Sequence, residues 1–482
     1  MERLIFGTDG WRDVIAERFT FANLRRAARA YADYLAGAGG AGPVLVGYDT
    51  RFMAREFAEV VSGVLAAAGL PTMLSQTYLP TPALSFAVRH LGAVGGVMLT
   101  ASHNPPHYGG FKLKGPYGGS ATDDIYRAVA ALVPDAEVPR HELVAYDTFD
   151  IRAEYFSAIA TLVDIDAIRS SRPTIVHDAM GGAGSGWLSG LAAATGAFEV
   201  ESVRGRPDPL FYGVNPEPIA ANLAHTIEKM AGSGTDPGSP LFASATDGDA
   251  DRIGVVLPGG EFFNSHQIFA VLLDHLAARR TGTVVKTFTV SRVVERLARA
   301  RGLPVVETPV GFKHIVDAML DGGDVGVLIG GEESGGIGVA GHIPERDAIA
   351  NTLLLLEAVV TSGRSLAQRF ADIESETGWR HAYDRVDLHL ADDGTKERVM
   401  ARLASPDLAD LGALPGRWHL AAVESRDGVK LNLARTADSE PSAWLLFRPS
   451  GTEPVLRLYC EAQNVDDVAA LLSGAEALVR SS

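Results

Sequence analysis

Short runs of strand-forming apolar residues alternate along this chain with longer stretches in which apolar and polar positions follow a helical period. Residues 44–49 precede a helical pattern at 57–68, and residues 174–178 precede another at 187–194. Strands that alternate with helices at this spacing are typical of βαβ units and mainly parallel sheets. The pattern therefore predicts an α/β protein.

Polar, glycine-containing loops follow these predicted strands. Residues 241–245 lead into Asp247-Gly248-Asp249, and residues 326–329 lead into Gly330-Gly331-Glu332. In α/β sheets, ligands bind beyond the carboxyl ends of the strands. These loops are therefore the first candidates for a binding site.

Three stretches interrupt the pattern and suggest domain boundaries: residues 133–140, residues 230–240 and the region near 374–384. Strand-like runs at 444–447 and 455–459, followed by a final helix, indicate a smaller α+β module. We predict three α/β domains and one α+β domain, at residues 1–145, 146–256, 257–372 and 373–482.

The composition is that of a folded protein, with 46% hydrophobic, 21% charged and 7% aromatic residues. The lone cysteine, Cys460, allows no internal disulfide and fits a reducing compartment. The first residues pass at once into Gly7-Thr8-Asp9-Gly10, which leaves too little room for a signal-peptide core. Apolar stretches such as 353–356 are far shorter than the ~20 residues of a membrane span. We expect a cytoplasmic protein and exclude secreted, collagenous and membrane-spanning classes.

The net charge is −16, from 43 Lys and Arg against 59 Asp and Glu. An acidic surface repels nucleic acid and anionic membranes, and we expect neither as a partner. A small phosphorylated ligand stays possible, because one concave site can be locally basic. The simplest interpretation of the acidity is solubility.

The segment TASHNPP at residues 100–106 follows the apolar run at 94–99. Ser102 therefore stands on a turn just past a strand, in a loop that two prolines stiffen. Such a position suits a nucleophile or a phosphate carrier, and a plain polar turn fits equally well. The neighbouring His103 does not indicate a hydrolase triad, whose members are remote in sequence.

The segment DGDADR at residues 247–252 places Asp247, Asp249 and Asp251 at alternate positions. Three carboxylates with small residues between them can converge on one hard cation. The segment lacks the later Gly and Glu of an EF-hand loop. With Arg252, it suits a pocket shared by a dication and a phosphate, with an exposed acidic turn as the alternative.

Two further loops carry groups for a sugar phosphate. In GGEESGG at 330–336, Glu332 and Ser334 can bind sugar hydroxyls while glycines allow close backbone approach. RPSGTEP at 448–454, followed by Arg457, combines guanidinium, hydroxyls and the N–H groups of a glycine turn in what looks like a phosphate cradle. A surface turn with an incidental arginine is the alternative for this last loop.

Taken together, the loops resemble those of the α-D-phosphohexomutase family. TASHNPPHYGGFK is similar to its phosphoserine loop, DGDADR to its metal loop, GEESGG to its sugar loop and RPSGTEP to its phosphate loop. GTDGWR at 7–12 and TPVGFK at 308–313 also match, and all six motifs occur in the family's order over the whole chain. The resemblance implies three related α/β domains with mixed sheets and a smaller TBP-like α+β domain around a central cleft.

The resemblance also implies an activity, the interconversion of hexose 1-phosphate and hexose 6-phosphate. Ser102 would carry a phosphoryl group, and Asp247, Asp249 and Asp251 with one oxygen of the phosphate on Ser102 would hold Mg²⁺. Hexose 1,6-bisphosphate would be the intermediate and activator, and it would turn over so that its other phosphate rephosphorylates Ser102. The implied partners are small-molecule hexose phosphates, and we expect a monomer or a homodimer.

Other functional positions of the family carry over residue by residue. Arg12 and Lys112 match residues beside the phosphoserine, with Lys112 as the proton-transfer group, and His103 would shape the loop. The implied substrate-binding residues are Arg252, Gly311, Lys313, Glu332, Ser334, Arg346, Arg448, Ser450, Gly451, Thr452 and Arg457.

The choice of hexose depends on departures within these loops. The mannose- and glucose-specific bacterial branch has histidines where this chain has Gly336 and the pair Phe312-Lys313. The run His-Ile-Pro-Glu-Arg-Asp at 342–347 instead resembles the glucose-type branch, and Glu333 replaces the glutamine of the glucosamine branch. We therefore favour glucose phosphates over mannose phosphates, and both over glucosamine phosphates. Arg346 stays charged, so we expect it to bind rather than donate protons.

Other activities could use the same loops. A phosphosugar phosphatase would release phosphate, and a bisphosphate synthase would accumulate bisphosphate. A binding module without activity would require a broken loop, and none is broken.

Overall fold

The structure, a computed structural model, describes residues 3–7, 9–140, 144–234, 238–323, 326–390, 392–404, 414–416, 418–449 and 455–481. Contacts between residues divide the chain into two compact units. Met1–Val285 and Gly311–Phe370 form the first unit, and Lys286–Val310 and Ala371–Ser482 form the second.

The first sheet has the order β1-β5-β4-β2-β3-β7, with β6 paired to β5. Its strands are β1 (Trp11–Val14), β2 (Val44–Tyr48), β3 (Thr72–Ser75), β4 (Gly95–Leu99), β5 (Tyr108–Gly115), β6 (Gly119–Ser120) and β7 (Asp147–Phe149). Strand β2 runs parallel to β3 and β4, and Tyr48 pairs with Leu99. The loops that follow β2 and β4 therefore leave the sheet at the same edge.

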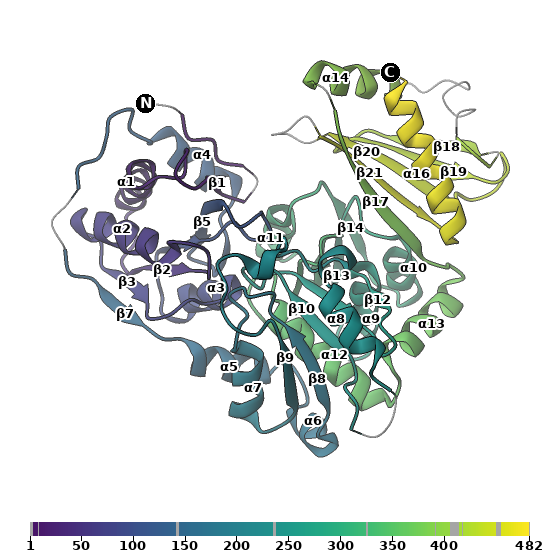
Figure 1. Ribbon diagram of the computed structural model, residues 1–482, viewed down its shortest axis with the longest axis horizontal. Helices are drawn as coiled ribbons and strands as arrows, with labels where there is room; N and C mark the ends of the chain where they lie inside the picture. Colours follow the sequence, from purple (N-terminus) through teal and green to yellow (C-terminus); the bar gives the residue numbers. More distant parts are fainter. Residues whose placement is uncertain are drawn as a thin grey trace. The chain divides into compact units, whose positions relative to one another are not determined.

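Helices cover both faces of this sheet: α1 (Phe21–Ala38), α2 (Ala54–Ala67), α3 (Thr81–His90) and α4 (Asp123–Ala131) (Figure 1). Val44 and Val46 of β2 point into a core shared with α1, α2 and α4. Gly47, the next residue, faces the opposite side, where Leu84 of α3 approaches closely. This alternation is why a strand buried on both faces is a continuous apolar run in the sequence.

The second sheet has the order β12-β11-β10-β8-β9. Its strands are β8 (Thr174–Asp178), β9 (Glu199–Val203), β10 (Ala243–Thr246), β11 (Ile253–Val256) and β12 (Phe262–Phe263), and its helices are α5 (Arg152–Ala160), α6 (Ile165–Ser171), α7 (Trp187–Thr195) and α8 (Ala224–Ala231). Two short 3-10 helices, η1 (Phe211–Gly213) and η2 (Ala220–Asn222), lie between β9 and α8. Strands β10 and β11 form an antiparallel hairpin whose loop is 247–252.

The third sheet has the order β14-β13-β15-β16, and the division between the two units passes through its β13. The strands are β13 (Thr283–Thr287), β14 (Val305–Thr308), β15 (Val327–Gly331) and β16 (Ile337–Val339), and the helices are α9 (Ser265–Ala277), α10 (Arg292–Ala300), α11 (Phe312–Asp321), α12 (Ala348–Ser362) and α13 (Leu366–Thr377). The β15–β16 hairpin carries the loop at 332–336.

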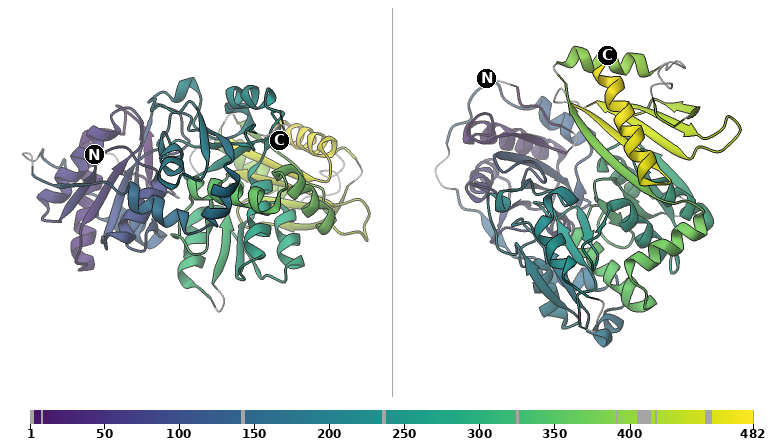
Figure 2. Two further views of the ribbon diagram at one scale, coloured as in Figure 1. Left: turned by 90° about the horizontal axis from the view of Figure 1, so that it is seen from below. Right: turned by 45° about the vertical axis from the view of Figure 1, so that its right-hand side comes forward.

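The fourth sheet is antiparallel, in the order β17-β21-β20-β19-β18. Its strands are β17 (Ala382–His389), β18 (His419–Glu424), β19 (Val429–Ala434), β20 (Ala443–Pro449) and β21 (Val455–Ala462), with helices α14 (Asp393–Leu403) and α16 (Val465–Arg480). Figure 2 shows α16 lying across one face of this sheet, and apolar residues of both helices share a core with that face.

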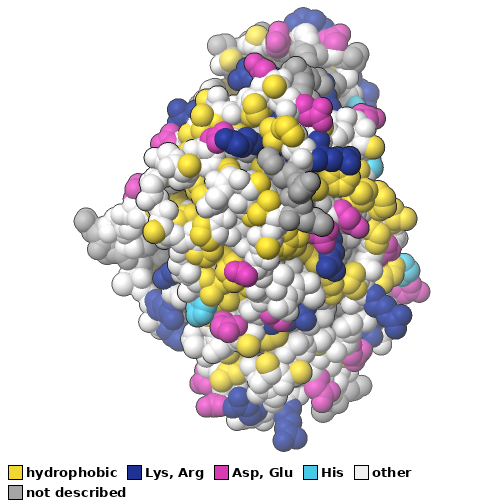
Figure 3. Space-filling view, turned by 90° about the vertical axis from the view of Figure 1, so that its left-hand side faces the viewer, with side chains coloured by type: hydrophobic (Ala, Val, Ile, Leu, Met, Phe, Trp, Pro, Cys, Tyr) yellow, Lys and Arg dark blue, Asp and Glu magenta, His cyan; other side chains and the backbone are white. Residues whose placement is uncertain are grey.

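The predicted fold class is confirmed: three α/β domains with mixed sheets precede a smaller α+β domain. The expectation of mainly parallel sheets is corrected, because β5, β11 and β16 each return as antiparallel hairpin partners. Among the described residues, no helix has both the length and the apolar character that a membrane crossing needs. On the face drawn in Figure 3, charged side chains of both signs are interspersed.

Candidate active site

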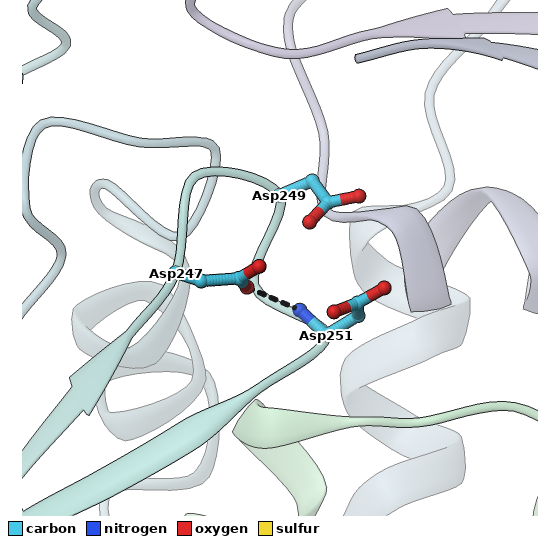
Figure 4. Close-up of side chains that lie close together, drawn as sticks. All are labelled: Asp247, Asp249 and Asp251. Carbon is cyan, nitrogen blue, oxygen red and sulfur yellow. Dashed lines mark hydrogen bonds between the residues drawn. The ribbon is translucent and has the colours of Figure 1, made fainter. Parts of the chain in front are cut away.

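The loop of the β10–β11 hairpin places three carboxylates together. Asp247, Asp249 and Asp251 are fully buried, and one oxygen from each lies within 4.8 Å of the others (Figure 4). Asp247 Oδ1 accepts hydrogen bonds from the backbone N–H groups of Asp251 (2.9 Å) and Arg252 (3.1 Å), which fold the loop. Burial and the two neighbouring carboxylates raise the pKa of Asp247 well above its usual value.

Two oxygens of this cluster show what the loop could hold. Asp249 Oδ1 and Asp251 Oδ1 are buried and have no hydrogen-bond partner among the described residues. A buried carboxylate oxygen without a donor costs free energy unless another positive group approaches it. Oxygen ligands are those that hard divalent cations prefer. The three residues therefore fit a site for such a cation.

Ser102 lies against this cluster although it is 145 residues away in sequence. Its hydroxyl donates to Asp247 Oδ2 at 2.9 Å, and His103 Nδ1 lies 3.3 Å from the serine Oγ. The residue is 1% exposed and has a left-handed backbone (φ 53°), a conformation that costs a non-glycine residue free energy. Such strained positions cluster at functional sites and persist only where surrounding contacts impose them.

Arg51, which sequence analysis did not identify, supplies most of those contacts. It follows β2 at the sheet edge from which the Ser102 loop leaves β4. Its guanidinium donates to the carbonyl oxygens of Asn104 (2.6 Å), Ser102 (2.7 Å), Pro105 (2.8 Å) and Tyr108 (3.1 Å). One buried side chain thus fixes the path of the whole loop, and we call this set of contacts the Arg51 clamp.

Asp49 holds both the clamp and the loop in place. Its carboxylate pairs with Arg51 at 3.2 Å and accepts a hydrogen bond from the Thr100 hydroxyl at 2.5 Å, and Thr100 Oγ1 in turn accepts from the Ser102 N–H at 2.9 Å. Burial raises the pKa of Asp49 to about 6 despite the Arg51 charge. The only sequence signal was the polar run Asp49-Thr50-Arg51 directly after a buried strand.

Lys112 on β5 brings a positive charge into the carboxylate cluster. Its fully buried ammonium lies 2.9 Å from Asp249, 3.0 Å from Asp9 and 3.4 Å from Asp251. Burial opposes its charge, but these carboxylates outweigh burial and raise the pKa of Lys112. The side chain is therefore protonated in this arrangement.

Arg12 on β1 lies at the edge of the same group. It donates to Asn104 Oδ1 at 2.9 Å and pairs with Asp9 Oδ2 at 3.1 Å. Asp9 also pairs with Lys112 and Arg346. Burial acts to raise the pKa of Asp9, but these three cations outweigh burial and hold that pKa well below its usual value. Asp9 belongs to the GTDGWR motif, but sequence analysis gave it no role.

Arg346 approaches the cluster from the loop before α12. Its guanidinium lies 2.7 Å from Asp251 and 3.1 Å from Asp9, and 3.6 Å from Glu332 in the β15–β16 loop. Burial raises the pKa of Glu332 to about 7, although the Arg346 charge acts in the opposite direction. A Cβ on Gly336 would lie 2.4 Å from Arg346 Cδ, so Arg346 fills the space that a side chain there would need.

The remaining residues of the first unit for which we predicted substrate contacts divide into two groups. Arg252 pairs by backbone with Gly336 and lies 4.0 Å from Asp251, and the Ser334 hydroxyl is buried without a hydrogen-bond partner among the described residues. Gly311 instead caps α11, and Lys313 pairs with both oxygens of Asp123 on α4 at 2.8 Å. Lys313 is thus held by an ion pair with α4.

In the second unit, Arg448 and Arg457 stand opposite each other on β20 and β21. Like charges in directly opposed positions destabilise a sheet unless an anion lies between them. Arg448 Nε lies 3.0 Å from Asp427, and Arg457 Nε is 3.8 Å from Asp387. Ser450, Gly451 and Thr452, which complete the predicted phosphate loop, lie outside the described residues.

The site suits phosphoryl transfer, because it places a serine hydroxyl at a cluster of three buried carboxylates together with Lys112 and Arg346. In such reactions, positioned charges provide most of the catalysis. Four family models match the chain: phosphoglucomutase/phosphomannomutase alpha/beta/alpha domain I at residues 3–138, domain II at 153–260, domain III at 264–376 and the C-terminal domain at 420–477. The chain belongs to the phosphoglucomutase/phosphomannomutase family and is an isomerase of the intramolecular phosphotransferase class.

Relatives over the full length agree with this assignment. A phosphoglucomutase/phosphomannomutase of Thermococcus kodakarensis is 30% identical over 95% of both chains, and a phosphoglucomutase of Komagataeibacter xylinus is 29% identical over 96% of this chain and 88% of its own. A crystal structure from Thermus thermophilus with the provisional name phosphomannomutase is 45% identical, covers 99% of both chains and has a TM-score of 0.87. Other relatives are named for glucosamine phosphates, so the names do not select one sugar.

Proposed function

We propose that this enzyme is a phosphohexomutase that interconverts glucose 1-phosphate and glucose 6-phosphate through a phosphoserine at Ser102 and a hexose 1,6-bisphosphate. The observation that carries the proposal is the 2.9 Å hydrogen bond from Ser102 to Asp247 in a buried carboxylate cluster. No second serine stands in that loop.

In the proposed forward step, a hydroxyl of the hexose monophosphate attacks the phosphorus on Ser102. The bond between phosphorus and the serine oxygen breaks and a bond to the sugar oxygen forms. The sugar hydroxyl gives up its proton to solvent, and solvent later restores the proton that Lys112 gives to the serine. The serine oxygen takes a proton, for which Lys112 is the proposed donor, because its ammonium is protonated and lies in the cluster that Ser102 contacts. Lys112 and Arg346 lower the cost of the negative charge on the transferred group.

Asp247, Asp249 and Asp251 are the proposed ligands of Mg²⁺, with the phosphate on Ser102 as a further ligand. Bound Mg²⁺ supplies positive charge beside the transferred phosphoryl group. The two unpartnered carboxylate oxygens support this assignment.

The bisphosphate must turn over before it rephosphorylates Ser102, so its sugar and its second phosphate need ligands in both orientations. Glu332 and Ser334 are the proposed ligands of the sugar hydroxyls, and Arg252, Gly311, Lys313 and Arg346 are proposed further contacts. Arg448 and Arg457, with Ser450, Gly451 and Thr452, are the proposed ligands of the phosphate that is not being transferred.

Mannose phosphate is the second candidate substrate, and the 45% identical relative with the provisional name phosphomannomutase favours it. The space above Gly336 supports glucose as the substrate. Arg346 fills the place that the histidine of the mannose- and glucose-specific branch would need, and the run at 342–347 resembles the glucose-type branch. We further propose a cytoplasmic monomer or homodimer, and light scattering of the purified protein can test its oligomeric state.

The test is a set of initial rates with glucose, mannose and glucosamine 1-phosphates, measured with Mg²⁺ and a trace of the matching bisphosphate. We expect the highest kcat/KM with glucose 1-phosphate and phosphate on part of the purified protein by intact mass. Ser102→Ala should lose turnover and the phosphate while keeping the wild-type Tm, and Ser75→Ala, a buried serine at the end of β3, is the matched control. Near-wild-type turnover by Ser102→Ala, or release of inorganic phosphate as the main reaction, would contradict the proposal.

A further inference from the structure

Arg346 reaches the carboxylate cluster from a short segment between β16 and α12, and it is flanked in sequence by two buried carboxylates. Glu345 is 0% exposed and Asp347 is 2% exposed. Neither residue received a role from the motifs. Their contacts lead to two different domains of the first unit.

Glu345 is held by residues of the first α/β domain. Its carboxylate lies 2.5 Å from the ammonium of Lys114 on β5 and accepts from Ser120 at 3.0 Å and from Ser85 on α3 at 3.2 Å. Its other oxygen accepts from the backbone N–H of Arg346 itself at 3.1 Å. The carboxylate thus fixes the backbone of Arg346 to the sheet that also carries Lys112.

Asp347 is held by the second α/β domain and by its own loop. Both of its oxygens accept from the Tyr155 hydroxyl of α5, at 2.8 and 2.9 Å, and His342 Nε2 lies 2.8 Å away. The same carboxylate caps α12 by accepting from the Ala350 N–H at 2.9 Å. One residue further on, the Ala348 N–H donates to the carbonyl of Ala250 in the metal loop at 3.3 Å.

The free-energy cost of burying the Lys114–Glu345 ion pair indicates the role of this contact. Both partners of the Lys114–Glu345 pair are 0% exposed, and a fully buried ion pair contributes little to stability because desolvation offsets its attraction. What such a pair does supply is a fixed geometry, since either charge left alone in the interior is strongly unfavourable. Here the geometry that it fixes is that of the backbone at Arg346.

We propose that Glu345 and Asp347 are positioning residues for Arg346, holding its guanidinium beside Asp251 and Glu332 by joining its backbone to the first and second α/β domains. The inference rests on the proposed mutase function, for which Arg346 would contact the reacting region. Lys114 and Tyr155 act through these two carboxylates, and they touch no reacting atom.

The test is a double-mutant cycle between Glu345→Gln and Arg346→Met, with mutase kcat/KM as the readout. Glutamine keeps the shape of Glu345 but loses the charge that fixes Lys114. We expect Glu345→Gln to lower kcat/KM by about 10- to 100-fold when Arg346 is present, and by no more than about twofold in the Arg346→Met protein. Equal losses in both backgrounds would overturn the proposal, because Glu345 would then act without Arg346.

Glu357→Gln is the matched control for a general effect on the fold. Glu357 is a buried carboxylate on the same helix that Asp347 caps, and it pairs with His275 (2.7 Å) and Arg279 (2.6 Å). Its substitution should lower Tm and show no coupling to Arg346. Coupling to Arg346 as large as that of Glu345→Gln would remove the special role of Glu345.

Two further variants separate position from stability. Lys114→Met/Glu345→Leu replaces the ion pair by apolar side chains, and we expect near-wild-type Tm with low kcat/KM; wild-type kcat/KM would overturn the proposal. Tyr155→Phe removes only the hydroxyl that holds Asp347. The loss of kcat/KM that it causes should also vanish in the Arg346→Met background.

The wild type is assayed first, with glucose and mannose phosphates. If the wild type shows no mutase turnover, the proposed function is contradicted. If the wild type is active but the effects of the variants are additive, only this inference is contradicted.

Discussion

The charge of Glu332 depends on the fold, because burial raises the pKa of its carboxyl group to about 7. An acid whose folded pKa exceeds its unfolded pKa binds a proton more tightly when folded. Its contribution to the free energy of unfolding is therefore present below pH 4.5 and lost as pH rises through 7. At pH 8 the fold carries an ionised, buried carboxylate whose nearest cation, Arg346, stands 3.6 Å away.

We expect Glu332→Gln to stabilise the protein at pH 8 by about 1–3 kcal/mol relative to the wild type, and by less at pH 5. The variant should lose mutase activity, because Glu332 is the proposed acceptor for sugar hydroxyls and an amide offers one acceptor oxygen in place of two. Thermal unfolding at both pH values, in one ionic strength and without added metal, measures the difference. The Tm difference between variant and wild type should widen from pH 5 to pH 8. If it does not, the raised pKa of Glu332 is contradicted.

At the scale of elements, the Arg51 clamp holds the Ser102 loop in its strained conformation. Four carbonyl oxygens of that loop accept from one planar guanidinium. A lysine carries the same charge but has no fork that can span the four acceptors. We expect Arg51→Lys to lower kcat by about 10- to 100-fold with little change in KM.

The measurement for Arg51→Lys is steady-state kinetics together with Tm. Arg55→Lys is the control, since Arg55 pairs with Glu59 on the exposed side of α2. We expect the control to match the wild type in both readouts. If Arg51→Lys lowers Tm but leaves kcat unchanged, the clamp supports the fold without serving the site.

The contact between the Ser102 loop and the acidic loop at 247–252 depends on Gly248. A Cβ on Gly248 would lie 2.4 Å from the carbonyl oxygen of Ser102, so Gly248→Ala must push the two loops apart. We expect at least about a 10-fold loss of kcat/KM, because sub-ångström displacement of reacting groups has effects of that order. Gly232→Ala at the end of α8 is the control, where a Cβ would meet only ordinary contact at 3.7 Å. Equal kinetics for the two variants would show that the loops need not touch.

The elements themselves were largely predictable from the sequence. The predicted helix at 187–194 matches α7, and the predicted strands at 174–178 and 326–329 match β8 and β15 closely. The antiparallel return strands β11 and β16 were not predicted, because they are short and follow polar hairpin loops without a helix between. Their apolar pattern resembles that of any buried strand, and only pairing decides their direction.

At the scale of the whole molecule, the sequence identified loops but not the residues that hold them. Ser102 and Asp247 were found because each loop carries its chemistry in consecutive residues, and the structure brings the two into contact. Arg51 and Glu345 had no such signal, because the groups that they hold across the fold are remote in sequence. The loop carbonyls that Arg51 binds begin 51 positions away, and Ser85, which donates to Glu345, lies 260 positions away. A charged residue directly after a predicted buried strand could have drawn attention to Arg51, and a place in the run at 342–347 could have drawn attention to Glu345.

Metal binding should stabilise the whole molecule as well as its site. The free energy of a ligand that binds only the folded state adds to the free energy of unfolding by about 2.7 kcal/mol at 100 times its Kd. We expect Mg²⁺ to raise the Tm of the metal-free wild type in a concentration-dependent way. The gain arises because two buried carboxylate oxygens, on Asp249 and Asp251, lack a hydrogen-bond donor among the described residues and would be bound by the cation.

Asp249→Asn should abolish this Mg²⁺-dependent rise, because the amide loses the charge that attracts a hard cation. Without metal, the Tm of the variant should differ from the wild-type Tm by less than the Mg²⁺-dependent rise, since Lys112 keeps Asp251 and Asp9 as partners. Glu357→Gln, with its carboxylate held by His275 and Arg279, should keep the full rise and so controls for a general loss of stability. Differential scanning calorimetry across a Mg²⁺ series measures all three proteins. A rise of equal size in Asp249→Asn and the wild type would place the cation elsewhere and would separate the acidic loop from the metal requirement.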